Sequence, residues 1–327
     1  MNRQLKRLVR GSLRWPMRRM AEAVAANLGR LMSDEDAYQI FYRRGFHLLR
    51  HHYYLPIPDA RDLGEDFWQR ESEMIGVDMN DAAALELLSR ITSYMTEFRE
   101  RFSLTGTDGA PGFHLLNGSF MAVDAHMYYC LIRHLKPRRI VEVGSGFSTL
   151  LAGQACVQNG RNGGSPVQLT AIEPYPSSFL KQGFPGLSEL IEKKVQDVDL
   201  NVFTSLEAND ILFIDSTHAL RSGGDVQLEF CEILPRLARG VLVHVHDISL
   251  PRAYPRVYFD THLYWNEQYL LQAFLAFNER FEVIWPGNYM ALRYPERVRE
   301  FFPEYDAMRN AYPSSEPTSF WMKVRPQ

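Results

Sequence analysis

The sequence predicts an α/β fold, a doubly wound, Rossmann-like and mostly parallel sheet of seven strands that follows an N-terminal helical region. Strand-like apolar runs alternate with segments of helical length between residues 139 and 247. The first run leads into a glycine-rich turn and a helix-like segment, "IVEVGSGFSTLLA" (140–152). Near the end, "FEVIWPGNYMALRY" (281–294) contains two strand-like runs around a turn and predicts a closing antiparallel hairpin.

The composition is that of an ordinary globular protein. The 327 residues are 46% hydrophobic and 23% charged, and the net charge of −3 gives no reason to expect nucleic acid as a partner. Cys130, Cys156 and Cys231 are too isolated for a disulfide framework or a zinc site and fit a reducing compartment. Because the chain has no apolar run of about 18 residues, we expect a cytoplasmic protein without a membrane-spanning helix.

Residues 1–20 hold seven Lys/Arg and no acid, and they lack the apolar centre of a secretory signal. Two alternatives stay open for this segment. Four apolar residues can share one helical face and give weak contact with an anionic membrane surface: Leu5, Leu8, Val9 and Leu13. The other alternative is a solvated, poorly ordered terminus, because Gly11 and Pro16 interrupt a helix.

Residues 21 to about 105 are expected to be mainly helical. The segment "DAAALELLSRITSYMTEFRERF" (81–102) has helical apolar spacing at Leu85, Leu88, Ile91, Met95 and Phe98. The turn-rich "SLTGTDGAPG" (103–112) then marks a break. We therefore predict a basic segment with a helical region (1–105), a main domain (106–295) and a C-terminal tail (296–327).

Within the main domain, the helix expected over 119–135 is closed by Pro137. Five strands are then expected in order: "RRIVEVG" (138–144), "LTAIE" (169–173), "IEKKVQD" (191–197), "DILFID" (210–215) and "GVLVHVHD" (240–247). The last is mostly apolar without clean alternation, which is typical of a strand buried on both faces.

The glycine-rich turn indicates a nucleoside cofactor. A dinucleotide fingerprint would have a third glycine where Thr149 stands, and the Glu142 carboxylate would face a pyrophosphate unfavourably. A carboxylate here suits a cationic cofactor without phosphate, such as S-adenosylmethionine. Glu173, at the end of the second strand, can accept both ribose hydroxyls, and Asp197, at the end of the third, can accept the adenine amino group.

Further cofactor contacts are expected from the turn itself and from the loop before the helix at 119–135. The turn offers Gly144, Ser145, Gly146, Phe147 and Ser148. In "LLNGSF" (115–120), Asn117 and Ser119 can reach the cofactor carboxylate.

"VEVGSGFST", "AIEP", "ILFIDSTH" and "GVLVHVHDI" together resemble the class I S-adenosylmethionine-dependent methyltransferases, most closely the bacterial branch called methyltransferase family 24. The resemblance covers roughly residues 110–295. In similar catechol O-methyltransferase-like enzymes, acids at the ends of the fourth and fifth strands bind Mg²⁺, which implies Asp215 and Asp247 here. Ile248 stands where those enzymes have an amide.

The same two strand ends carry the candidate catalytic residues. Parallel neighbours lie about 5 Å apart, so Asp215 and Asp247 should converge, and with an imidazole they suit Mg²⁺ or Mn²⁺. His218 is the candidate general base, or else a group that only supports the site. His246 is a ligand or a packing residue, whereas His244 fits a core position. Asp215 alternatively orients the methionine part of the cofactor.

The expected function is methyl transfer to a hydroxyl of a small molecule or saccharide. Trp265, Asn266 and Gln268 can bind the acceptor or can pack a helix, and "HHYY" (51–54) can cover the cleft or pack between domains. Two other classes stay open: a metal- or nicotinamide-dependent oxidoreductase, and a non-catalytic cofactor-binding protein at a membrane surface.

Overall fold

The computed structural model describes residues 3–31, 33–47, 49–106, 112–161, 163 and 165–325, and the chain forms two compact units, 1–59 and 60–327. The first unit contains helices α1 (Arg3–Leu31) and α2 (Glu35–Arg43). Pro16 lies inside α1, so the predicted interruption at Gly11 and Pro16 is wrong. The side chains of Leu5, Leu8, Val9 and Leu13 lie outside the described part. No helix in the described residues is long and apolar enough to cross a membrane.

The second unit is built on one seven-stranded sheet in the order β3-β2-β1-β4-β5-β7-β6. The strands are β1 (Arg139–Val143), β2 (Gln168–Ile172), β3 (Glu189–Ile191), β4 (Ile211–Ile214), β5 (Leu242–Val245), β6 (Phe281–Pro286) and β7 (Phe320–Val324). The first five are parallel, and β7 is antiparallel to both β5 and β6. The predicted fold class, a doubly wound sheet with an antiparallel pair, is confirmed.

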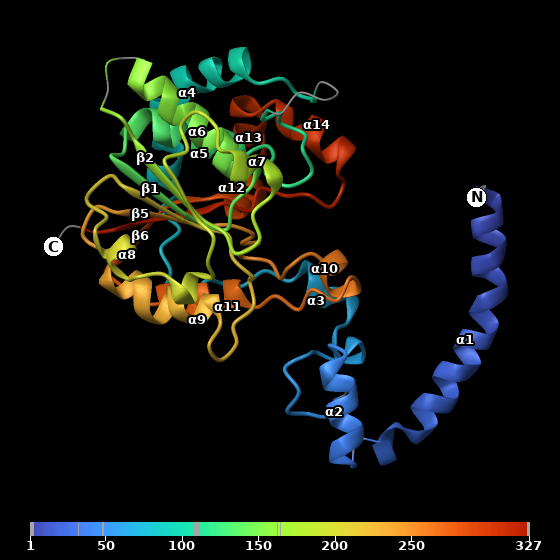
Figure 1. The fold of residues 1–327 in the computed structure, drawn as a ribbon. Helices are drawn as coiled ribbons and strands as arrows, with labels where there is room; N and C mark the ends of the chain where they lie inside the picture. Colours follow the sequence, from blue (N-terminus) through green and yellow to red (C-terminus); the bar gives the residue numbers. More distant parts are fainter. Residues whose placement is uncertain are drawn as a thin grey trace. The chain divides into compact units, whose positions relative to one another are not determined.

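Helices lie on both faces of this sheet (Figure 1). The α-helices are α3 (Glu65–Gln69), α4 (Asp81–Arg101), α5 (Asp124–Leu135), α6 (Phe147–Arg161), α7 (Ser178–Gln182), α8 (Asn201–Thr204), α9 (Asp225–Leu228), α10 (Arg256–Asp260), α11 (Glu267–Leu275), α12 (Gly287–Arg293), α13 (Pro295–Phe301) and α14 (Glu304–Ala311). Shorter turns are η1 (Ala60–Asp62), η2 (Val195–Asp197), the π-helical η3 (Glu229–Ile233) and η4 (Leu234–Arg236). Helices α4, α5 and α6 cover one face, whereas α9 and α11 cover the other.

Alternate residues of the central strands fill two separate cores. Ile140 of β1 and Phe213 of β4 belong to the core under α4, α5 and α6. Val141 of β1 and Leu212 of β4 point to the opposite core, which includes Phe230 of η3. Because both faces are covered by helices, these strands are apolar on both sides, as the sequence of the β5 segment indicated.

The helical region around α4 and the sheet form one compact unit, although the sequence predicted a boundary near residue 105. Helix α4 buries Leu88, Ile91, Met95 and Phe98 in the core that it shares with α5 and α6. Its apolar stripe was read correctly from the sequence, but burial against the sheet domain makes α4 part of that domain. The observed division lies at residues 59 and 60.

The predicted hairpin at residues 281–294 is wrong, and residues 320–324 of the expected tail form a strand. Strand β6 matches "FEVIW", but "YMALRY" lies in helix α12, since Met, Ala and Leu are strong helix formers. The antiparallel partner of β6 is β7, which comes from the expected tail and lies between β5 and β6. The third strand is also shorter than expected, because β3 ends at Ile191 and residues 195–197 form η2.

Candidate active site

The carboxyl ends of β1, β2 and β4 surround a cavity of about 570 Å³. Ligands of open α/β sheets bind at this edge. The lining includes Gly144 after β1, Glu173 after β2, Gln196 in η2, and Asp215 and Thr217 after β4. The cavity is thus formed by segments that follow four neighbouring strands, β1 to β4, with carboxylates after β2 and β4.

The two glycines of the turn have different roles. Gly144 has φ +81°, and a Cβ there would lie 1.8 Å from the carbonyl oxygen of Asp215, so only glycine fits. A Cβ at Gly146 would meet nothing within 4 Å, which leaves open space beside the backbone. The Gly146 N–H donates to Thr149 Oγ1 at 3.0 Å. Thr149, where a dinucleotide fingerprint has its third glycine, therefore helps to begin α6.

Glu142 lies inside the protein, not on the cavity lining. The Tyr128 hydroxyl of α5 donates to Glu142 Oε1 at 2.7 Å, and both side chains are fully buried. Burial raises the pKa of Glu142 to about 7, although hydrogen bonds from Thr149 and Tyr128 oppose this rise. The structure thus places this acid behind the glycine-rich turn.

Glu173 lies on the cavity wall, as predicted from its strand end. Its Oε1 accepts the Tyr175 N–H at 2.8 Å, which orients the carboxylate. Asp197, expected to lie at the end of the third strand, is not among the lining residues; Gln196 lines the cavity instead. The reason is that the chain turns into η2 after β3 ends, which changes the residue that faces the cavity.

The other predicted cofactor residues named below are not among the residues that line the cavity. Asn117 uses its amide within its own loop: it donates to the His114 and Phe120 carbonyls and accepts the Ser119 and Phe120 N–H groups. Ser119 is exposed. In the turn, Ser145 and Phe147 are half-buried, and Ser148 is buried at the start of α6.

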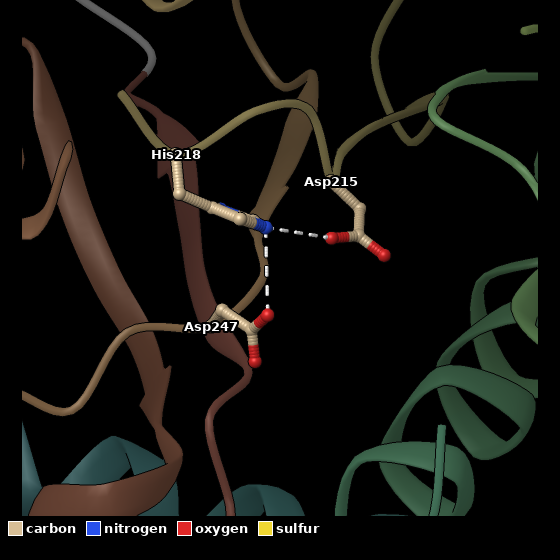
Figure 2. A group of neighbouring side chains, drawn as sticks. All are labelled: Asp215, His218 and Asp247. Carbon is tan, nitrogen blue, oxygen red and sulfur yellow. Dashed lines mark ion pairs between the residues drawn. The ribbon is translucent and has the colours of Figure 1, made fainter. Parts of the chain in front are cut away.

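Beside the cavity, three ionisable side chains converge from the ends of β4 and β5. His218 Nε2 lies 3.2 Å from Asp215 Oδ1 and 3.4 Å from Asp247 Oδ2. Figure 2 shows the Nε2 edge of the imidazole directed at one oxygen of each carboxylate. His218 and Asp247 both have positive φ, +57° and +56°, which non-glycine residues rarely adopt. The predicted convergence of the two strand ends is therefore present in the geometry.

Glu267 completes this cluster, and the sequence reasoning missed it. Asp215, His218, Asp247 and Glu267 are called the acidic group below. Its Oε2 lies 2.8 Å from His218 Nδ1, and the side chain is fully buried at the first turn of α11. The N–H groups of Asn266 and Glu267 also bond to the His218 carbonyl. An acid opening a helix usually signals only a favourable interaction with the helix dipole, so its local sequence gave no indication of this role.

The surrounding carboxylates control the charge of His218. Burial alone would lower the pKa of His218, but hydrogen bonds to Asp215 and Glu267 and the nearby Asp247 raise it well above its ordinary value. Burial would raise the pKa of Asp215, but His246 and His218 lower it overall. The neighbouring carboxylates thus favour the protonated form of His218.

The segment just before β7 contacts Asp247 and the residue after it. Thr318 Oγ1 is 3.3 Å from Asp247 Oδ1, and the Ile248 N–H donates to the Thr318 carbonyl. Asp124, buried at the start of α5, accepts the N–H groups of Thr318 and Ser319. These residues also escaped the sequence reasoning, since the segment before β7 was expected to be a tail.

His244 in β5 and His246 just after it have separate environments. His244 is fully buried, and its Nε2 lies 2.8 Å from Ser319 Oγ. Burial and the neighbouring His246 lower the pKa of His244 well below its ordinary value, which keeps it neutral. His246 packs against Phe120, and its Nε2 lies 3.8 Å from Asp247 Oδ1. His244 therefore occupies a core position, and His246 lies at the border of the acidic group.

The acceptor candidates have different surroundings. The Trp265 ring lies 4.3 Å from the His218 ring and 4.6 Å from the Tyr258 ring, centre to centre, and forms an aromatic wall. Asn266 accepts the Leu220 N–H. Gln268 is fully buried and bonds to the Ser249 and Arg252 backbone. Trp265 thus lies beside the acidic group, whereas Gln268 fixes α11 to the neighbouring backbone.

A family model described as a methyltransferase domain matches residues 141–248. An uncharacterised protein of Archaeoglobus fulgidus is 36% identical over 168 residues, which are 49% of this chain and 74% of that protein. An O-methyltransferase from Bacillus cereus in complex with S-adenosylhomocysteine (SAH) is 14% identical to this chain. The match covers 75% of this chain and 91% of that protein, with a TM-score of 0.33. A plantazolicin methyltransferase in complex with SAH is 11% identical, covers 76% and 100%, and has a TM-score of 0.37.

Proposed function

From the premise that the chain belongs to the class I S-adenosylmethionine-dependent methyltransferases, we propose that it methylates a hydroxyl of a small molecule or saccharide. The observation that carries the proposal is the position of the acidic group. Asp215 both lines the cavity and lies 3.2 Å from His218. A hydroxyl beside Asp215 would lie next to a nucleoside bound in the cavity.

The cavity wall suits the proposed cofactor. The Glu173 carboxylate accepts hydrogen bonds from the ribose hydroxyls, as acids in this position do in nucleoside sites. Gln196 lies on the wall in η2 and offers its amide to the adenine. The open backbone at Gly146 admits the methionine part.

The reaction is a displacement at the sulfonium methyl. The acceptor oxygen forms the new bond to carbon, the carbon–sulfur bond breaks with its electron pair going to sulfur, and the hydroxyl proton leaves to a base. His218 was the expected base, but its raised pKa means that it already holds a proton. We therefore assign the proton to Asp215, whose second oxygen points away from His218 (Figure 2).

Holding the acceptor against the methyl contributes to catalysis by itself. Well-oriented reactants gain up to about 7 to 11 kcal/mol in model systems. The wall of Trp265 and Tyr258 beside His218 offers flat apolar faces for a sugar or aromatic ring. This wall is the element to which we assign acceptor positioning.

The test measures SAH release from S-adenosylmethionine with panels of sugars, phenols, amines and thiols. Turnover with a sugar or phenol supports the proposal, whereas turnover with amines or thiols alone contradicts hydroxyl transfer. Glu173→Ala should weaken SAH binding at least about tenfold in calorimetry, because hydrogen bonds to charged groups contribute about 1.5 to 3 kcal/mol. Glu189→Ala, an exposed change on β3, is the matched control. Unchanged affinity in Glu173→Ala, or a response to NAD alone, would refute the cofactor assignment.

A further inference from the structure

We propose that Asp215, His218 and Asp247 together hold a divalent cation, with His218 Nε2 as a nitrogen ligand, and that the site prefers a first-row transition metal to Mg²⁺. The sequence indicated Asp215 and Asp247, with an imidazole, as a site for Mg²⁺ or Mn²⁺, but it gave His218 the role of general base. The inference rests on the proposed function only in that a cation here would lie beside the acceptor hydroxyl. Its evidence is the arrangement of the side chains themselves.

The spacing of the three ligand atoms fits one ion. Metal–ligand bonds of about 2.1 Å at right angles put adjacent ligand atoms about 3 Å apart. The observed separations from His218 Nε2 are 3.2 Å to Asp215 Oδ1 and 3.4 Å to Asp247 Oδ2. All three ligand atoms lie within 4.8 Å of one another. Small side-chain adjustments therefore suffice to bind an ion.

Glu267 gives the second, independent observation. A metal-bound histidine almost always donates its other ring N–H to a carboxylate or carbonyl, which fixes its orientation and strengthens it as a ligand. The buried Glu267 carboxylate lies 2.8 Å from His218 Nδ1 and accepts this N–H. When a metal ion displaces the Nε2 proton to solvent, the lone pair of Nε2 faces the two aspartates, which is the orientation that a metal ligand needs (Figure 2).

The charge around His218 also favours a cation. Asp215, Asp247 and Glu267 bring three carboxylates to one imidazole. Like charges this close repel strongly in a poorly solvated site. A divalent ion between the aspartates offsets this repulsion and leaves the Glu267–His218 hydrogen bond intact.

The ligand set decides the class of metal. Imidazole suits Fe²⁺, Ni²⁺, Cu²⁺ and Zn²⁺, whereas Mg²⁺ prefers oxygen ligands and retained waters. An amide oxygen would favour Mg²⁺, but the next residue after Asp247 is Ile248, which is buried and has no side-chain donor atom. When bound, the ion supplies a Lewis acid that lowers the pKa of a coordinated hydroxyl.

The test uses the full chain after metal removal, with each metal added alone. Calorimetric titrations with Mg²⁺, Mn²⁺ and Co²⁺ should give a dissociation constant for Co²⁺ at least about tenfold lower than for Mg²⁺. Pulsed electron paramagnetic resonance of bound Mn²⁺ should show coupling to an imidazole nitrogen. Equal affinity for Mg²⁺ and Co²⁺, absence of nitrogen coupling, or no metal binding would each overturn the proposal.

Substitutions test whether His218 supplies the nitrogen ligand of the metal. His218→Asn keeps a residue that tolerates positive φ but replaces nitrogen by an amide oxygen, so the nitrogen coupling should vanish and the preference for Co²⁺ over Mg²⁺ should fall at least about tenfold. Glu267→Gln should weaken Co²⁺ binding by about 10- to 100-fold, as loss of outer hydrogen-bond partners does. His262→Asn, an exposed residue also at positive φ, is the matched control and should change neither.

Two outcomes separate this inference from the function on which it rests. Circular dichroism first establishes that each variant is folded. If the coupling disappears in His246→Asn but survives in His218→Asn, the ligand assignment is wrong. SAH binding, measured without metal, tests the proposed function by itself: SAH binding without metal binding refutes only the metal site, and metal binding without SAH binding refutes only the proposed cofactor.

Discussion

Replacing Glu142 by glutamine should stabilise the protein at pH 8 but not at pH 5. Glu142 is fully buried and accepts a hydrogen bond from the Tyr128 hydroxyl. Burial raises its pKa from 4.5 to about 7, with a further contribution from the charge of Asp215 and opposition from Thr149 and Tyr128. Glutamine removes the charge and keeps a carbonyl oxygen for Tyr128.

The sign and size follow from proton linkage. In the unfolded chain the carboxyl loses its proton near pH 4.5, but in the folded protein it keeps the proton up to about pH 7. The folded state therefore binds more protons between these values, and the free energy of unfolding falls as the pH rises. At 1.36 kcal/mol per pKa unit, the loss is about 3 kcal/mol above pH 7. Glu142→Gln avoids this loss.

Urea unfolding at pH 5 and pH 8, followed by circular dichroism, measures the effect. We expect the midpoint of Glu142→Gln to exceed that of the unmodified protein at pH 8, with a much smaller difference at pH 5. Glu189→Gln, an exposed substitution on β3, should show no such pH dependence. A variant that is less stable at pH 8, or that gains equally at both pH values, would refute the reasoning.

Two other substitutions and one deletion test the fold. Gly144→Ala should lower the free energy of unfolding by more than about 2 kcal/mol and abolish SAH binding, because the new Cβ would lie 1.8 Å from the Asp215 carbonyl oxygen; wild-type stability in urea would contradict the tight packing. Leu88→Ala should cost about 2 to 5 kcal/mol in the same assay, since this α4 side chain is fully buried, and a loss below about 1 kcal/mol would speak against α4 as part of the core. Deleting residues 312–327 removes β7 and should abolish cooperative thermal unfolding, whereas a cooperative transition would show that β7 is dispensable.

Much of the fold could be predicted because its signals are local. The alternation of apolar runs with helical segments predicts the parallel sheet, and the apolar spacing over residues 81–102 predicts α4. The place of β7 between β5 and β6 depends instead on pairing across a long stretch of chain. No local pattern in "FWMKV" (320–324) specifies which strand it joins.

The residues of the candidate site could likewise be predicted only in part from the sequence. Asp215 and Asp247 could be brought together from the sequence because both follow parallel strands that end at one edge. Gln196 lines the cavity where Asp197 was expected, because the end of β3 cannot be predicted to a single residue. Glu267 approaches His218 only through the packing of α11, which the sequence of that helix does not encode by itself.

The position of β7 also has a consequence for biosynthesis. The ribosome makes β5 and β6 before β7, so both strands have an unpaired edge until residues 320–324 emerge. Exposed strand edges invite pairing with other chains, and partly made domains aggregate through them. Thr318, which bonds to Asp247, arrives with the same segment. The nascent chain therefore lacks both a closed sheet and a complete acidic group until this last stretch is synthesised, which makes chaperone shielding most valuable just before that point.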